Sequence, residues 1–535
     1  MNGAESLVRT LLGCGVDTCF ANPGTSEMHF VAALDRVEGT RCVLGMAETV
    51  VTACADGYAR MKGRPAATLL HCGPGFANGI ANIHNARRAY SPMVNIVGDH
   101  ATYHSPLDPP LAADTEGLAK AVCDWVRKSH SALEVGADGA AAVHAARSAP
   151  GQIATLILPA DVSWNEGGVV GEPLPVAPPA PVSTETIRRV AATLRRREPT
   201  VIVLSGAALC EAGLVAAQRI ADATGARLFT PSQVARMARG RGRPRVDRIP
   251  YSVDRALEAL AGTQHVILVA AKPPTTFFAY PGKPSRVYPQ GAKVQTLAEV
   301  EEDAVSALEA LAEEVGVRNG KNGSRIAAPA GASGMTNGSF RTLQQEQRSG
   351  IQFVPRGAFD PVAFAHTLAP LLPDNCIVME EGVTSGRALF APTFDAAPHD
   401  WLQITGGAIG QGFPCATGAA IACPDRKVVC LEADGSGMYS LQALWTQARE
   451  KADVVNVVFA NRTYKILQGE LGAVGANPGR ASEELFDLAR PALDWVKLAG
   501  GMGVEGTRVE NLEGFADVFT AACAHRGPFL IEFVI

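Results

Sequence analysis

The sequence predicts an α/β protein of three domains, each built on a parallel β-sheet. The chain has 535 residues, whereas a single hydrophobic core seldom serves more than about 250–300 residues. Hydrophobic residues make up 47% of the chain and charged residues 19%, which is enough apolar material to cover sheets with helices on both faces. Two breaks in the apolar pattern and a repeated order of elements at the two ends divide the chain into three.

Proline marks the first break, and small or polar residues mark the second. Residues 166–184 contain five prolines, and such a density excludes a helix or a central strand. Between about 317 and 350, Gly, Asn, Ser and Ala dominate, so parts of this segment are expected to be disordered. We therefore predict an N-terminal domain at 1–165, a central domain at 185–316 and a C-terminal domain at 351–535.

The two outer blocks repeat one order of predicted elements. In the first block a helix, a strand, a turn, a helix and a strand are expected, in that order, at 47–60, 66–70, 73–75, 76–88 and 94–97. In the last block the same five elements are expected at 413–422, 427–431, 435–437, 439–451 and 454–459. Parallel strands joined by helical crossovers place their turns at the carboxyl edge of the sheet, where open α/β folds bind ligands. We therefore expect the chemistry at that edge in both outer domains.

The central block carries apolar runs but no chemical motif. Residues 201–204 and 266–271 are expected to form buried parallel strands. The turn after the first run lacks the three-glycine spacing of a dinucleotide-binding loop, which makes FAD an unlikely cofactor.

Charge and composition exclude several classes of function. The net charge is −5, and the basic residues form no stripe that would bind nucleic acid. The Arg-rich run 236–248 is interpreted as a solvated loop. Twelve cysteines without a C-x-x-C pair indicate reduced thiols in a cytoplasmic protein, and no apolar run reaches the ~18–20 residues of a membrane span.

Two oxygen-bearing side chains are predicted to end neighbouring strands of the last block. Asp434 follows one predicted strand and Asn461 the next, and a carboxylate with a carboxamide suits a hard cation such as Mg²⁺. Gly435 and Ser436 then open a helix, whose free amides favour a diphosphate. Taken singly, Asp434 could cap that helix and Asn461 could close a turn.

The first block places one acidic side chain at the start of an apolar helix. Glu48 lies among Met46, Ala47, Val50 and Val51, where it would be poorly solvated and would need a buried basic partner. The alternative is a carboxylate that only stabilises the helix N-terminus.

Together these motifs resemble the thiamine diphosphate-dependent enzymes, among them acetolactate synthases, pyruvate oxidases and benzoylformate decarboxylases. The resemblance covers almost the whole chain. It implies metal coordination by Asp434, Asn461 and the backbone carbonyl of Thr463. The chain departs from the family pattern at Ala433, where a Gly is usual, and at Ala460, where an Asn is usual.

The resemblance also assigns contacts to the cofactor. Glu48, followed by the sequence Asp-Gly-Tyr-Ala at 56–59, matches the residue that hydrogen-bonds the pyrimidine ring, and Asn78 would touch the same ring. In the 406–410 segment, Gly407 lies beside Ile409, which matches the apolar residue that holds the cofactor in its bent form. An ordinary core role for Ile409 stays open. Two residues at another predicted strand end would donate to the diphosphate: Thr384 and Ser385.

Substrate contacts are implied by a closer likeness of the N-terminal block to benzoylformate decarboxylase. Thr25 stands where that enzyme has a Ser, and His71 stands where it has a His, although a purely structural His71 remains an alternative. The second usual His corresponds to Phe277, which argues against benzoylformate as the substrate. His100 and His104 are further candidates to face the substrate, or else surface residues.

The activity implied is a thiamine diphosphate- and Mg²⁺-dependent carboligase of the acetolactate synthase type, which decarboxylates a small 2-oxo acid through a C2 ylid and an enamine. Two alternatives stay open. One is a simple decarboxylase, and the other is a catalytically silent cofactor-binding regulator, against which the presence of Glu48 counts. Because family members build each site across two subunits, the resemblance also implies a homodimer or homotetramer.

Overall fold

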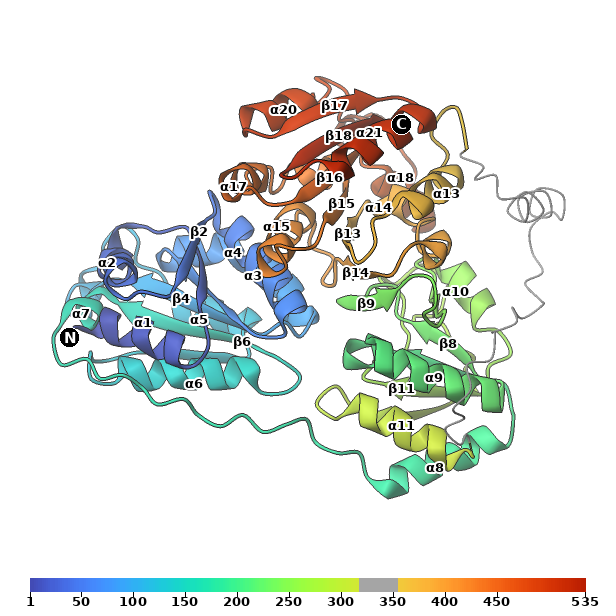
Figure 1. The fold of residues 1–535 in the computed structure, drawn as a ribbon, viewed down its shortest axis with the longest axis horizontal. Helices are drawn as coiled ribbons and strands as arrows, with labels where there is room; N and C mark the ends of the chain where they lie inside the picture. Colours follow the sequence, from blue (N-terminus) through green and yellow to red (C-terminus); the bar gives the residue numbers. More distant parts are fainter. Residues whose placement is uncertain (317–354) are drawn as a thin grey trace.

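The computed structural model describes residues 1–316 and 355–535, which form three β-sheets with helices packed against them (Figure 1). The fold class predicted from the sequence is confirmed: each sheet is parallel except for one edge strand of the third. The second predicted break, 317–350, lies outside the described residues. The proline-rich stretch after residue 166 contains no helix or named strand, and Figure 1 shows it as a long connection between the first and second sheets. The domain boundaries themselves stay a prediction.

The first sheet has six strands in the order β2-β1-β3-β4-β6-β5. Its strands are β1 (Thr18–Ala21), β2 (Arg41–Leu44), β3 (Ala66–Leu70), β4 (Met93–Asp99), β5 (Trp125–Lys128) and β6 (Ile153–Pro159). Its helices are α1 (Gly3–Gly13), α2 (Met28–Arg36), α3 (Glu48–Lys62), α4 (Cys72–Arg88), α5 (Thr115–Val122), α6 (Val135–Arg147) and α7 (Ala160–Trp164). The 3₁₀ turn η1 (Thr25–Glu27) follows β1.

The second sheet has five strands in the order β10-β8-β7-β11-β12. Its strands are β7 (Thr200–Leu204), β8 (Arg227–Thr230), β10 (Asp247–Arg248), β11 (His265–Val269) and β12 (Lys293–Ala298). Its helices are α8 (Thr184–Arg195), α9 (Glu211–Thr224), α10 (Val253–Ala259) and α11 (Ala304–Glu314).

The third sheet has seven strands in the order β17-β18-β16-β15-β13-β14-β9. Its strands are β9 (Arg236–Arg239), β13 (Ile377–Glu381), β14 (His399–Gln403), β15 (Val428–Ala433), β16 (Val454–Ala460), β17 (Glu505–Val509) and β18 (Phe529–Val534). Its helices are α13 (Pro361–Leu371), α14 (Val383–Gly386), α15 (Gly412–Ala422), α16 (Asp434–Gly437), α17 (Ala443–Glu450), α18 (Lys465–Ala473), α19 (Arg480–Phe486), α20 (Trp495–Gly501) and α21 (Leu512–Ala524).

The interpretation of the Arg-rich run as a solvated loop is wrong. Residues 236–239 form β9, which leaves the central block and pairs antiparallel with β14 at the edge of the third sheet. Arg239 is fully buried, and its guanidinium carbon lies 4.0 Å from the ring centroids of both Phe390 and Phe394. Cation–π contacts with these two rings stabilise the guanidinium charge, which the sequence analysis expected to be exposed to solvent.

The predicted turns at 73–75 and 435–437 are also wrong, because both segments are helical. Helix α4 begins at Cys72, and it tolerates Pro74 because the first helical turn needs no backbone donor there. Residues 434–437 form the short helix α16. The predicted helix at 439–451 is shorter, since α17 spans only Ala443–Glu450.

The first and third sheets meet through helices α3 and α15, which lie side by side at the centre of Figure 1. Glycine makes the close approach possible, because a Cβ at Gly57 would collide with the carbonyl oxygen of Cys415, and one at Gly418 with that of Cys54. One continuous apolar core includes residues from both helices. Among residues 1–316 and 355–535, no helix is long and apolar enough to span a membrane.

Replacing Gly57 by Ala tests this contact. The added methyl group must push α3 away from α15, and overpacking of this kind costs about 1–3 kcal/mol. We expect the free energy of unfolding, measured in urea, to fall by that amount. Gly13→Ala is the matched control, because its Cβ would meet no atom within 4 Å. Equal stability of the two variants would contradict the close helix contact.

Candidate active site

Asp434 and Asn461 lie at the carboxyl edge of the third sheet. Strands β15 and β16 are neighbours, with Ala433 opposite Phe459, so the residues that follow each strand come together. Asp434 Oδ2 accepts a hydrogen bond from the Arg462 amide at 2.6 Å, which ties the two turns directly. Asn461 Oδ1 accepts from the Thr463 amide at 3.0 Å. Three oxygen-bearing positions expected from the sequence are thus gathered in one place.

The Asp434 carboxyl is 2% exposed. Burial raises its pKa to about 6, because the charged form loses hydration. A bound cation would stabilise that charged form. The set of oxygen donors therefore fits a hard divalent metal ion.

The turn after β15 is shaped by close packing. A Cβ at Gly435 would lie 2.5 Å from the ring of Tyr464, so only glycine leaves that ring in place. The Ser436 hydroxyl donates to Glu432 and, at 3.2 Å, to the carbonyl oxygen of Ala433. Its side chain is thus engaged inside the sheet, and its backbone amide remains as the group for an anion.

Thr384 and Ser385 lie in α14, directly after β13. The Thr384 hydroxyl oxygen is buried and has no hydrogen-bond partner within the described ranges. Ser385 is 6% exposed. A buried hydroxyl without a partner is costly, and an anionic oxygen at the same sheet edge would satisfy it.

The 406–410 segment is held from both sides. Asn85 in α4 donates to the Ala408 carbonyl at 2.7 Å, and Glu381 at the end of β13 accepts from the Gly410 amide at 2.8 Å. Gly407 has a φ of +79°, and a Cβ there would lie 2.6 Å from Phe277 Cζ. Ile409 is half-buried between these anchors.

Two buried glutamates lie at this end of the third sheet, and the sequence analysis missed both. Glu381 bonds the 406–410 segment, and Glu432 accepts from the Ala433 amide and the Ser436 hydroxyl. Glu381 and Glu432 stand opposite each other on β13 and β15. Burial raises the pKa of both carboxyls, and the proximity of Glu381 raises that of Glu432 further. The signal in the sequence for these two glutamates was an acidic residue at or next to the end of an apolar strand.

Glu48 is the first residue of α3, and Ala47 is the N-cap. Glu48 is an acidic residue in the first turn, where a carboxylate also stabilises the helix N-terminus, so that alternative stays open. The carboxylate is 8% exposed and accepts a hydrogen bond from Asn78 Nδ2 at 3.3 Å. The two residues expected to face a pyrimidine ring are therefore in contact, and the partner is an amide instead of the basic group expected.

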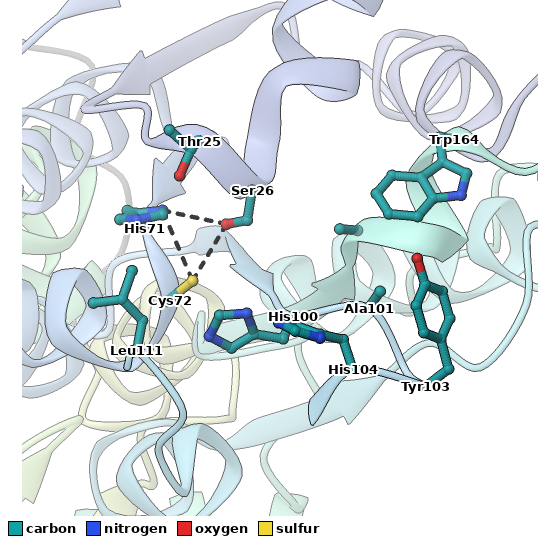
Figure 2. A pocket seen from close by; sticks show the side chains of 11 residues that line it. Thr25, Ser26, His71, Cys72, His100, Ala101, Tyr103, His104, Leu111 and Trp164 are labelled. Atoms are coloured by element: carbon teal, nitrogen blue, oxygen red, sulfur yellow. Dashed lines mark hydrogen bonds between the residues drawn. The ribbon is translucent and has the colours of Figure 1, made fainter. Parts of the chain in front are cut away.

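A cavity of about 370 Å³ opens beside the first sheet. Figure 2 shows its walls, on which Thr25 and His71 lie across from His100 and His104. Apolar surface comes from Leu111 and Trp164. Four residues considered for substrate contact thus line one cavity.

Glu27 organises this cavity, and the sequence analysis missed its role. It is 1% exposed, and its carboxylate lies 3.0 Å from His71 Nδ1. It also accepts hydrogen bonds from the Gly24 amide at 2.7 Å and from the Ser26 hydroxyl. This arrangement holds the imidazole with Nδ1 engaged, which leaves Nε2 as the nitrogen for another partner. The signal in the sequence was an acidic residue in the same turn as Thr25.

Asn82 connects the two ends of the chain near the candidate site. It donates to the Thr49 carbonyl at 3.0 Å and to the Gly410 carbonyl at 3.4 Å. Across residues 1–316 and 355–535, however, no hydrogen bond joins Glu48, Asn78 or His71 to the Asp434 turn. One chain therefore presents two groups of candidate residues on adjoining surfaces.

Two family models match the outer parts of the chain. Residues 1–122 match "Thiamine pyrophosphate enzyme, N-terminal TPP binding domain", and residues 388–533 match "Thiamine pyrophosphate enzyme, C-terminal TPP binding domain". A Mycobacterium tuberculosis protein, "Putative acetolactate synthase large subunit IlvX", is 48% identical over 100% of this chain and 99% of its own. A Pseudomonas aeruginosa benzoylformate decarboxylase is 26% identical over 97% of this chain and 96% of its own.

Solved structures agree with these matches. A thiamine diphosphate-dependent 4-hydroxybenzoylformate decarboxylase of Rhodococcus jostii superimposes with a TM-score of 0.82 and 25% identity. The match covers 99% of this chain and 98% of that one. A benzoylformate decarboxylase of Polynucleobacter necessarius shares the fold, with a TM-score of 0.82 at 20% identity.

Replacing Glu27 by Gln tests how the His71 ring is held. In the native protein the carboxylate should keep the proton of neutral His71 on Nδ1, whereas a neutral amide should allow both tautomers. Nitrogen chemical shifts of labelled histidine report the tautomer. Glu38→Gln, at an exposed position, should leave the spectrum unchanged. An unaltered His71 tautomer in the Glu27 variant would contradict the assignment.

Proposed function

The chain belongs to the thiamine pyrophosphate enzyme family, whose members act on 2-oxo acids, and from this premise we propose that it is a Mg²⁺-dependent decarboxylating carboligase. The observation that carries the proposal is the hydrogen bond between Asp434 and the Arg462 amide, which gathers oxygen donors at the edge where parallel sheets bind ligands. Asp434, Asn461 and the Thr463 carbonyl would hold Mg²⁺, which prefers oxygen ligands and shares them with phosphate.

The residues around this edge fit the rest of the cofactor. The amides of Gly435 and Ser436 and the hydroxyls of Thr384 and Ser385 would bind the diphosphate. Gly407 and Ile409 would support the bent form, because their segment is fixed by Asn85 and Glu381. Bound thiamine diphosphate supplies a sink for the electron pair left when carbon dioxide departs.

Glu48 would hold and move the proton that activates the pyrimidine ring. Its carboxylate is nearly buried beside Asn78, so a hydrogen bond formed there would be little screened by water. Asn78 would keep the carboxylate directed at the ring.

The cavity around His71 would receive the 2-oxo acid. In its protonated form, His71 would donate from Nε2 to the substrate carboxylate or give that proton to the reacting carbon, since Glu27 already engages Nδ1. Thr25 would orient the substrate from beside His71, and His100 and His104 line the facing wall of the same cavity. Leu111 and Trp164 would contact an apolar part of the substrate.

A second copy of the chain would complete each site. Glu48 and the cavity belong to the first sheet and the Asp434 turn to the third, and the two groups are not hydrogen-bonded within the described part of one chain. We therefore propose a homodimer or homotetramer whose sites lie between subunits, acting on a small molecule in the cytoplasm.

Two candidate reactions, carboligation and simple decarboxylation, differ in what happens to the acyl unit after carbon dioxide leaves. Carboligation is favoured by the relative that is 48% identical over the full length and is named as an acetolactate synthase large subunit. Decarboxylation to an aldehyde is favoured by the Glu27–His71 pair, because a positioned imidazole can protonate the acyl carbon before a second carbonyl arrives.

Product analysis separates these candidates. Purified protein with Mg²⁺ and thiamine diphosphate is incubated with pyruvate alone and with pyruvate plus an aldehyde. We expect carbon dioxide together with a 2-hydroxy ketone product. Free aldehyde as the sole product would favour the decarboxylase, and no carbon dioxide from a panel of aliphatic and aromatic 2-oxo acids would contradict both.

Glu48→Gln tests the proton transfer. Glutamine keeps the size of the side chain but cannot exchange the proton, so kcat for carbon dioxide release should fall by about 10²–10⁴-fold. Thiamine diphosphate binding, measured by calorimetry, should remain. Glu38→Gln again serves as the exposed control, and undiminished kcat in the Glu48 variant would exclude this role.

Asp434→Asn tests the metal site. The substitution removes the negative charge but keeps the shape of the side chain. Mutating residues that support a metal site typically lowers metal affinity at least about tenfold, and we expect a loss of that size in Mg²⁺-dependent binding of thiamine diphosphate. Equilibrium dialysis measures the bound cofactor without reference to activity. Asp425→Asn, at an exposed position, should bind as the native protein does, and the assignment fails if both variants do.

A further inference from the structure

We propose that Glu27, His71 and Cys72 form a second cation site, which binds a borderline-soft divalent ion such as Zn²⁺ on the wall of the substrate cavity. One oxygen, one nitrogen and one sulfur atom of these side chains lie within 4.8 Å of one another. Glu27 and Cys72 are each 1% exposed. Figure 2 shows His71, Cys72 and Ser26 converging at this wall. The combination of a carboxylate, an imidazole and a thiol is typical of zinc ligands.

The spacing of the donor atoms fits a tetrahedral ion. Zinc bonds of about 2.0–2.3 Å require about 3.3 Å between nitrogen and oxygen ligands and about 3.6 Å between nitrogen and sulfur. In the structure, His71 Nδ1 lies 3.0 and 3.1 Å from the two Glu27 oxygens and 3.8 Å from Cys72 Sγ. The two spacings that involve His71 therefore lie within a few tenths of an ångström of the tetrahedral values. The Glu27 and Cys72 ligand atoms lie within 4.8 Å of each other and would move closer on binding, while the Ser26 hydroxyl, which bonds all three side chains, would turn away.

The backbone holds these side chains in place before any ion arrives. Cys72 has a φ of +52° at the junction between β3 and α4, a conformation that non-glycine residues adopt only where the surroundings enforce it. Glycines make room for the other two ligands. A Cβ at Gly24 would collide with the His71 ring, and a Cβ at Gly98 with the Glu27 carboxylate. Such preorganisation lowers the cost of binding an ion.

The ligand types separate this site from the proposed Mg²⁺ site. Sulfur and imidazole nitrogen favour Zn²⁺, Co²⁺ and similar ions over Mg²⁺, which prefers oxygen alone. The fourth coordination position would open into the cavity. His100 lines that cavity, but among the residues described only Glu27, His71 and Cys72 have their ligand atoms all within 4.8 Å of one another, so a water molecule would take the fourth position.

An ion at this site would take the Nδ1 atom that Glu27 otherwise engages, and it would narrow the cavity. Zn²⁺ would therefore compete with the 2-oxo acid. This inhibitory consequence rests on the proposed function, whereas the binding itself does not.

Cobalt titration of the full-length protein tests the binding. Co²⁺ is added to metal-free protein with Mg²⁺ present and no substrate, and the absorption band of a cobalt–thiolate bond is followed. We expect one equivalent of Co²⁺ to produce the band and Zn²⁺ to abolish it by displacement. Because no turnover is measured, failure of the proposed reaction leaves this result unaffected.

Variants assign the band to the cluster. Cys72→Ser should eliminate it, and Glu27→Gln should weaken Zn²⁺ binding by at least about tenfold. Cys42→Ser and Cys210→Ser, which change exposed cysteines, are the matched controls and should retain both the band and the affinity. Circular dichroism verifies the fold, and Glu27→Gln keeps the test decisive if Cys72→Ser does not fold. Tight Zn²⁺ binding that survives in Glu27→Gln, or a cobalt spectrum without a thiolate band, would overturn the proposal.

Discussion

The arrangement of the two cofactor-binding parts depends on a buried ion pair between Asp56 and Arg60. Two guanidinium nitrogens of Arg60 donate to the Asp56 carboxylate at 2.7 and 2.8 Å, and both side chains are almost completely buried. The carboxylate also accepts from Ser91 at 2.5 Å and from Gln411. Arg60 donates further to the Gln403 carbonyl at 2.6 Å. A buried pair is tolerated only when its hydrogen bonds are completed in this way, so the charge on α3 requires the loop before α15 to lie where it does.

This requirement positions the 406–410 segment between two sheets. Asn85 from the first sheet's α4 and Glu381 from the third sheet's β13 bond it from opposite sides. The surface proposed for the bent cofactor is therefore a product of interdomain packing. The glycines of the 406–410 segment allow this backbone conformation but do not select it.

The cavity proposed for the substrate depends on different contacts, because all its lining residues belong to the turns and helices around the first sheet. Strand β3 ends at Leu70, and η1 follows β1, so the parallel pairing of β1 with β3 brings Glu27 beside His71. One set of buried contacts then fixes the imidazole and also creates the proposed Glu27–His71–Cys72 ion site. The proposed role of His71 and the proposed ion site thus depend on the same geometry.

The sequence by itself determined the parallel α/β class, four strands of the outer sheets (β3, β4, β15 and β16) and the placement of Asp434 and Asn461 at the ends of neighbouring strands. Apolar periodicity and the spacing between strand ends are local properties, and strand ends of a parallel sheet must meet at one edge. Only the tertiary structure decided the placement of β9 in the third sheet, the burial of Arg239 and the contacts of Glu27, Glu381 and Glu432. These features depend on residues distant in the chain, whose desolvation and hydrogen bonding exist only after the sheets have packed.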